Sequence, residues 1–249
     1  MATESDLQKC LESNLSASGY IKLKNEKMFL KLVNGEILQF VSYYKVRTYR
    51  KGVCEFGISA GVSTIYRPSI DADILSRCEM SIKLLASRLN LPFDEPLYRL
   101  RIGGDSNVKA LSSAVRNVSR FICKIFKSVT NLNEFVEFKK KTDVSSLTLR
   151  NDFPGDSLAL IKSGNSDDFL NVYDDVIHSL RKSGICDCDN YGLICKNLYR
   201  ETVEMTAGAR DAVRSDPEKY SAAIDECERR RRENLALLKK YNVVCPEEG

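Results

Sequence analysis

Four side chains that can ligate a metal lie within one short stretch of the chain: His178, Cys186, Cys188 and Cys195. A structural zinc site takes four such ligands, usually in pairs about two to four residues apart. Here one residue separates Cys186 from Cys188, and the other two ligands have no close neighbour. The remaining cysteines are scattered, mostly at apolar positions: Cys10, Cys54, Cys78, Cys123, Cys227 and Cys245. We therefore predict reduced thiols, no bound metal and no cofactor; whether the four side chains cluster in space stays open.

A second candidate is the turn Gly103-Gly104-Asp105-Ser106, which separates a predicted strand from a predicted helix. Free N–H groups and the helix dipole at such a place can hold a phosphate or a carboxylate. The turn has neither the Gly-Lys-Ser/Thr of a P-loop nor the Gly-x-Gly-x-x-Gly of a dinucleotide fold. The alternative is a plain turn in which Asp105 or Ser106 caps the helix.

The densest run of charge is Arg229 to Arg232. On a helix these four arginines fan around the axis, and acidic residues stand four positions away from three of them: Asp225, Glu226, Glu228 and Glu233. Such pairs form locally on a helix surface. The pattern indicates a solvated, ion-paired face and disfavours nucleic acid as a partner, because the arginine charge is already matched.

The last candidate is one side of a predicted sheet. Residues of one strand parity project to the same side, which groups basic and aromatic side chains of two strands: Tyr43, Lys45, Arg47, Tyr49, Arg99 and Arg101. Gln39, Glu55, Gly57, Ser59 and Gly61 are expected beside them. Tyr and Arg often carry interface energy, so we predict a face that binds a partner protein or an anionic ligand. The alternative is that a helix of the same chain covers this face.

No catalytic signature accompanies these candidates. The chain lacks a Gly-x-Ser-x-Gly elbow, a His-Glu-x-x-His pair and a kinase-like set. It has a single histidine, which removes any mechanism that needs two. The sequence therefore favours a binding protein over an enzyme.

The elements that must position these residues begin with a meander over 19–62. Asn34-Gly35 between two alternating runs is a strong hairpin signal, since a type I′ turn needs φ > 0 at both central positions. Alternation predicts one apolar face on three strands, formed by Met28, Leu30, Leu32, Leu38, Phe40, Tyr44, Val46, Cys54, Phe56, Ile58, Ala60 and Val62.

Segments whose apolar residues have helical spacing precede and follow the meander. It predicts helices over 4–17, 70–90, 108–129 and 132–141, with a short strand over 97–102. The stripe that includes Val115, Val118 and Ile122 is the strongest, and this helix is expected to be the main cover of the sheet. After a connection over 142–155 the pattern is helical, with the last helix starting near Pro217.

Composition is that of an ordinary globular protein: 249 residues, 43% hydrophobic, 29% charged and a formal net charge of +4. The polar, acidic start is unlike a secretory leader, and nine cysteines without one fit a reducing compartment. No apolar run is long enough to span a membrane. We expect a cytoplasmic protein.

The order of a short helix, a Gly-aromatic pair, a strand, Asn-Gly, a long strand and Phe-Gly-Ile resembles the bacterial DUF4304-type family of unknown function. The resemblance covers about the first hundred residues and rests on Gly19-Tyr20, Phe29-Leu30-Lys31, Gly35, Gln39 and Phe56-Gly57-Ile58. It implies an α+β fold and brings no activity.

The sequence thus predicts an α+β protein: an antiparallel sheet of four to five strands covered by helices, with a helical C-terminal half. Its expected parts are 1–142, holding the meander and the long helix, and 143–249. The expected function is that of a non-enzymatic binding protein, such as an immunity-like or adaptor module. The alternative is an enzyme or anion-binding protein that uses Gly103-Gly104.

Overall fold

The computed structural model describes residues 2–24, 26–46, 53–67, 70–75, 79–92, 99–103, 107–142, 159, 162–164 and 217–243. The chain divides into two compact units. The first is made of Met1–Ser63, Asp71–Thr142 and Leu237–Gly249, and the second of Thr64–Ile70 and Asp143–Ala236. The first unit contains most of the sheet and the helices that pack on it, which confirms the predicted α+β class.

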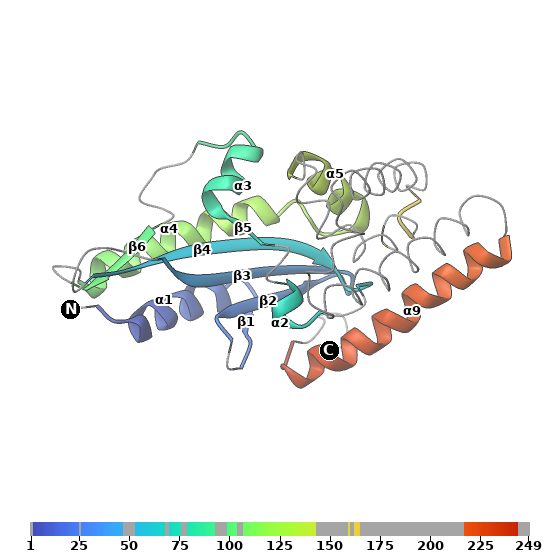
Figure 1. The fold of residues 1–249 in the computed structure, drawn as a ribbon, viewed down its shortest axis with the longest axis horizontal. Coiled ribbons are helices and arrows are strands. Elements are labelled where there is room, and N and C mark those ends of the chain that lie inside the picture. Colours follow the sequence, from blue (N-terminus) through green and yellow to red (C-terminus); the bar gives the residue numbers. More distant parts are fainter. Residues whose placement is uncertain are drawn as a thin grey trace, which may run out of the picture. The chain divides into compact units, whose positions relative to one another are not determined.

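Among the described residues the sheet has six strands. They are shown in Figure 1: β1 (Ile21–Lys22), β2 (Met28–Val33), β3 (Ile37–Val46), β4 (Val53–Thr64), β5 (Met80–Ser81) and β6 (Arg99–Gly103). The order is β1-β2-β3-β4-β5, and β6 also pairs with β4. Both β5 and β6 pair antiparallel with β4, β5 at Ser59 and Ala60 and β6 at residues 53–57. These two short strands therefore lie end to end along one edge of β4.

The predicted hairpin joins β2 to β3. Asn34 and Gly35 have φ of 49° and 66°, and Glu36 N–H donates to Val33 C=O at 3.1 Å. Both central residues occupy the left-handed region that a type I′ turn requires, and this region disfavours most L-residues. The turn fixes the register from Val33↔Ile37 to Met28↔Ser42.

Two helices cover one side of this sheet and pack against each other: α1 (Glu4–Ser16) and α4 (Val108–Phe126). Thr3 caps α1 in a reciprocal box with Asp6, and Asn107 caps α4 by accepting from Ala110 N–H at 2.8 Å. The predicted stripes are confirmed, because Val115, Val118 and Ile122 of α4 and the three leucines of α1 are all buried. Figure 1 shows the two helices on the same side of the long strands.

A buried glutamine joins the sheet to the end of α4. Gln39 of β3 donates through Nε2 to the carbonyls of Phe126 and Val129, both at 3.0 Å. Its Oε1 accepts from Tyr20 Oη at 3.0 Å. The last carbonyls of a helix have no partner within the helix, so this buried side chain adds a donor to the carbonyl of Phe126, the last residue of α4, and another to the carbonyl of Val129 three residues later.

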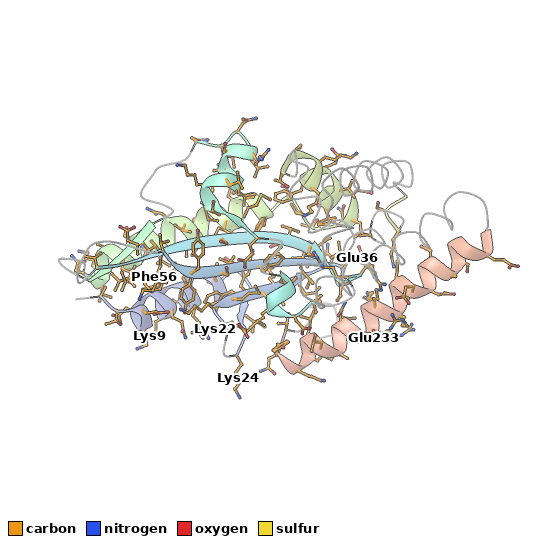
Figure 2. The ribbon with its side chains drawn as sticks, viewed as in Figure 1. Lys9, Lys22, Lys24, Glu36, Phe56 and Glu233 are labelled. Carbon is orange, nitrogen blue, oxygen red and sulfur yellow. The ribbon has the colours of Figure 1, made fainter. Side chains whose placement is uncertain are left out.

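The predicted pairing of faces between β3 and β4 is wrong. The ring centroids of Tyr43 and Phe56 lie 6.2 Å apart, whereas the ring of Tyr44 lies over Gly57. Phe56 (Figure 2) therefore shares its side with Tyr43, and the helices α1 and α4 cover that side. Tyr44 shares the other side with Gly57. The central strands are buried on both faces at most positions, so neither side is the open polar surface that alternation predicted.

The single helix predicted over 70–90 is also wrong. The structure has α2 (Ala72–Leu75), then β5, then α3 (Ile82–Arg88). Met80 and Ser81 pair with β4, and the Ser81 side chain accepts from Leu84 N–H at 3.3 Å, which caps α3. The pairing of β5 with β4 and the cap of α3 therefore divide a segment whose apolar residues have the spacing of one continuous helix. The remaining helix of this unit is α5 (Leu132–Thr142).

The described core of the second unit is a turn held by α9 (Pro217–Lys240), whose residues up to Ala236 belong to it. Asn234 Nδ2 donates to the carbonyls of Ile65 and Arg67 at 2.7 and 2.8 Å. Arg230 donates to Glu226 Oε1 at 2.7 Å and, at 3.4 Å, to the carbonyl of Tyr66. Arg230 is only 5% exposed, so the prediction that it lies on a solvated face is wrong.

Candidate binding face of the sheet

The six residues predicted to form a binding face do not come together. Tyr43 is 3% exposed, so it is a core residue and its assignment to an open face is wrong. Its hydroxyl donates to Gln8 of α1 at 3.3 Å, and Lys27 Nζ lies 5.4 Å from its ring centroid. Lys45 is exposed, and alternation places it on the side of Tyr43. Arg47 and Tyr49 lie outside the described residues.

The two arginines of the later strand have a defined place in the ladder. Arg99 pairs with Gly57 and Arg101 with Glu55, as Cα partners of β6 and β4. In the ladder these two positions therefore have the parity of Glu55 and Gly57.

The structure instead presents Tyr44, which alternation placed in the core. Tyr44 is 43% exposed. A Cβ built on Gly57 would lie 2.4 Å from Tyr44 Cζ and 2.6 Å from its Oη, much closer than real Cβ atoms come to other atoms. The absence of a side chain at Gly57 thus allows the ring to lie against β4. A glycine inside a strand is the signal that could have found this site, since it marks close approach.

We name the Tyr44–Gly57 face by the residues of β3 and β4 that share this side at this end of the sheet: Ser42, Tyr44, Glu55, Gly57 and Ser59. One further side chain reaches it from the residue before β5. Ser42 Oγ donates to Glu79 Oε2 at 2.6 Å, whereas Glu79 Oε1 is buried without a hydrogen-bond partner in the part of the chain that the structure describes. Ser42 and Glu79 therefore make this face polar at the position two residues before Tyr44 on β3.

The environment of Glu79 disfavours its charged form. Burial raises the pKa of this carboxyl to about 7 from a usual value of 4.5, and the hydrogen bond from Ser42 opposes the shift without cancelling it. A single donated hydrogen bond does not replace the water that an ionised carboxylate loses on burial. Near neutral pH both the protonated and the charged form of this carboxyl are therefore populated.

This shift makes stability depend on pH. The folded-state pKa of Glu79 lies above its unfolded value, so its contribution is complete below pH about 4.5 and is lost as pH rises through about 7. At pH 8 the charged carboxylate should cost up to about 3 kcal/mol. We expect Glu79→Gln to be more stable than the wild type at pH 8, by about 1–3 kcal/mol, and to differ little at pH 5. Urea unfolding at the two pH values measures this.

Glu12→Gln is the control for that measurement, because Glu12 is an exposed residue of α1. It should change the free energy of unfolding by less than about 0.5 kcal/mol at either pH. Equal effects of the Glu79 and Glu12 substitutions at pH 8 would contradict the assignment.

The turn predicted to bind an anion is not the start of a helix. Gly103 ends β6 as the partner of Val53, and Gly104, Asp105 and Ser106 lie outside the described residues. The helix begins at Val108 and its cap is Asn107, so the prediction that Asp105 or Ser106 caps it is wrong. The side chain of Asn107 already occupies the N–H of Ala110, which removes one of the donors that an anion needs there.

The described residues offer neither a metal site nor a membrane span. No group of three or more His, Cys, Asp or Glu side chains among them is placed to hold a metal ion. None of the helices that the structure describes is both long and apolar enough to cross a bilayer. The four predicted ligand candidates, His178, Cys186, Cys188 and Cys195, lie outside the described residues.

Comparison of the chain with protein-family models, with curated proteins and with solved structures found no match. The resemblance to the DUF4304-type family stays a prediction from its motifs. Function must therefore be inferred from the geometry of the Tyr44–Gly57 face.

Proposed function

We propose that the protein is a non-enzymatic binding protein of the cytoplasm and that the exposed Tyr44 side chain of the Tyr44–Gly57 face is its contact with the partner. The observation that carries this proposal is the exposed ring of Tyr44, which lies against β4 over Gly57. An aromatic side chain held in one orientation loses little conformational entropy on binding and buries a large area. Tyrosines of this kind are common among residues that dominate interface energy.

The proposed partner is a protein with an acidic surface. The proposed role of this binding is that of an adaptor or an immunity-like protein. Two arginine positions of β6 stand in the ladder beside Glu55 and Gly57, and basic residues favour acidic partners through faster association at low salt. The alternative, an anion site at Gly103-Gly104, gains no support from a helix that starts at Val108.

The test compares partner recovery with stability in three variants. Tyr44→Ala removes the ring, and we expect recovery of the partner from a native lysate to fall at least tenfold, the scale of an interface hot spot. Its free energy of unfolding should change by less than about 1 kcal/mol, the range of one cross-strand pair. Gly57→Ala should act in the same direction, because its methyl group displaces the ring from β4.

Leu84→Ala is the matched control, since Leu84 of α3 is 41% exposed and lies on another element. It should leave recovery unchanged. A Tyr44→Ala protein that recovers its partner as well as the wild type would refute the proposed surface. A large loss of stability in Tyr44→Ala would show that the ring belongs to the fold.

A further inference from the structure

The outer face of α4 and its C-cap carries basic side chains and no acidic one. With 3.6 residues per turn, these positions fall within about 80° of the helix circumference, opposite the buried stripe that packs over the sheet. We call them the basic stripe, and all five side chains are exposed: Lys109, Arg116, Arg120, Lys124 and Lys127. The sequence from Asn107 to Asn133 contains neither Asp nor Glu.

The charge of this stripe is not matched in the way that the charge of the arginine run on α9 is. No ion pair joins any of its five residues to another residue that the structure describes. Of the acidic residues of α1, which packs on α4, Glu4 pairs with Lys27 at 2.6 Å and Asp6 accepts from the N–H and hydroxyl of Thr3. The third, Glu12, is exposed and forms no ion pair with the stripe.

The end of the stripe beside α5 is less basic than the rest. Lys124 lines a groove together with Glu134 and Glu137, whose carboxylates offset part of its charge. The excess of positive charge is therefore centred on Arg116 and Arg120, one turn apart, and extends to the start of α4.

The stripe lacks two features that stabilise a helix. Arg116, Arg120 and Lys124 follow one another at intervals of four residues, and like charges at this spacing repel. Lys109 is the second residue of α4, and the first turn has no acidic residue to favour the helix dipole. A face that serves solubility alone normally mixes both signs of charge, whereas departures from such local rules are expected at functional sites.

The other side chains of this face indicate which polyanion it fits. Ser113 and Asn117 are exposed beside the basic residues, and serine, asparagine, lysine and arginine are all types that contact phosphate oxygens. The large apolar side chains exposed among the described residues lie outside the stripe: Tyr44, Leu84 and Val108. Helices that bind a membrane surface insert apolar residues, and proteins that bind single strands stack bases on aromatic rings. The phosphate backbone of a duplex needs neither.

We propose that the basic stripe of α4 binds the phosphate backbone of double-stranded nucleic acid without reading its sequence. Arg116 and Arg120, about 6 Å apart along the helix axis, form the centre of the contact, and Lys109 extends it by about 10 Å. The stripe lies on the helical side of the sheet (Figure 1), whereas Tyr44 lies on the other side. The proposal therefore goes beyond the proposed function and does not rest on it.

Fluorescence anisotropy of a short labelled DNA duplex tests the proposal. We expect saturable binding with a dissociation constant of about 10⁻⁵–10⁻⁴ M at physiological salt. Binding releases counterions from the phosphates, so a plot of the logarithm of the binding constant against that of the salt concentration should have a slope of about −3, the value for three phosphate contacts. A second duplex of unrelated sequence should bind equally well.

Arg116→Ala combined with Arg120→Ala should weaken binding about 5–30-fold, the effect of two exposed ion pairs, and change the slope to about −1. The matched control is Lys9→Ala combined with Lys24→Ala, which removes the same net charge from exposed positions on α1 and after β1, both labelled in Figure 2. Its affinity and slope should equal those of the wild type. A melting curve verifies that each variant is folded.

Three results would overturn the proposal: no saturable binding of either duplex, equal weakening by the two double variants, or binding to phosphatidylserine vesicles without binding to DNA. Tyr44→Ala should bind the duplex as the wild type does. A protein that binds no duplex, but whose Tyr44→Ala variant loses its partner, would therefore refute this inference and leave the proposed function standing.

Discussion

Replacing Ile122 by alanine should lower the free energy of unfolding of the first unit by about 2–5 kcal/mol. Ile122 is fully buried on the stripe of α4 that packs with α1 over the sheet. The substitution removes three carbon atoms from a closely packed interior. It therefore costs both the lost transfer free energy and a cavity that the neighbours fill only in part.

The control is a shortening of similar kind on the exposed surface of the same helix. Val108 is 46% exposed at the first position of α4, and Val108→Ala should change stability by less than about 0.5 kcal/mol. The chain has no tryptophan, so circular dichroism follows urea unfolding, and hydrogen exchange in α1, β2 and β3 localises the loss to the first unit. If the two substitutions were equally mild, the assignment of this helix to the core would be wrong.

Replacing Arg230 by alanine should destabilise the second unit by about 2–4 kcal/mol. The guanidinium is buried, donates to Glu226 and lies within reach of the carbonyl of Tyr66. Its removal leaves that carbonyl without this donor and opens space beside the turn that Asn234 also holds. The cost stays below that of a fully isolated charge, because Glu226 keeps its pair with Arg229 at 2.6 Å.

Arg232→Ala is the comparison, since Arg232 is exposed on the same helix. It should change stability by less than about 0.5 kcal/mol. The second comparison is Arg229→Ala, which removes the exposed pairs with Glu226 and with Glu233; Figure 2 labels Glu233 on α9. Exposed pairs are worth little, so we expect a loss of less than about 1 kcal/mol. Losses of equal size at positions 229, 230 and 232 would show that burial of Arg230 does not stabilise this unit.

Local chemistry explains what could be predicted from the sequence. Asn34-Gly35 specifies its turn through backbone torsions that few other residues adopt, and the positions of Val115, Val118 and Ile122 repeat with the period of a helix. The first signal lies within a single hairpin and the second within a single helix. Each can therefore be recognised without knowing which residues distant in sequence are in contact.

The faces of β3 and β4 could not be predicted in this way. A tight turn fixes the register of β2 and β3, but the sequence between β3 and β4 carries no such turn signal, and a shift of one residue exchanges the two faces. Tyr43 and Tyr44 are adjacent, so the wrong choice of faces assigned Tyr43 to the binding face and Tyr44 to the core. The contact of Tyr44 with Gly57 decides between them, and it is tertiary.

The burial of the charged residue Arg230 could not be predicted from the sequence either. Arg230 and Arg232 differ by two positions in a run of four arginines, and only the turn at Ile65–Arg67 distinguishes them. A groove beside α3, α4 and α5 could not be predicted for the same reason, since its lining residues Leu91, Ile125 and Phe138 come from separate segments of the chain. Their positions have no common period in sequence.

Gln39 has a consequence for how this protein can diverge. Its amide donates to two carbonyls at the end of α4 and accepts from Tyr20, so three segments distant in sequence share one side chain. A glutamate here would place a negative charge against the negative end of the helix dipole. A leucine would remove a donor from the carbonyls of Phe126 and Val129, although the carbonyl of Phe126 also accepts from the N–H of Val129 at 3.0 Å. We therefore expect position 39 to change in homologues only together with position 20 or the length of α4, so that these sites covary although about ninety residues separate two of them.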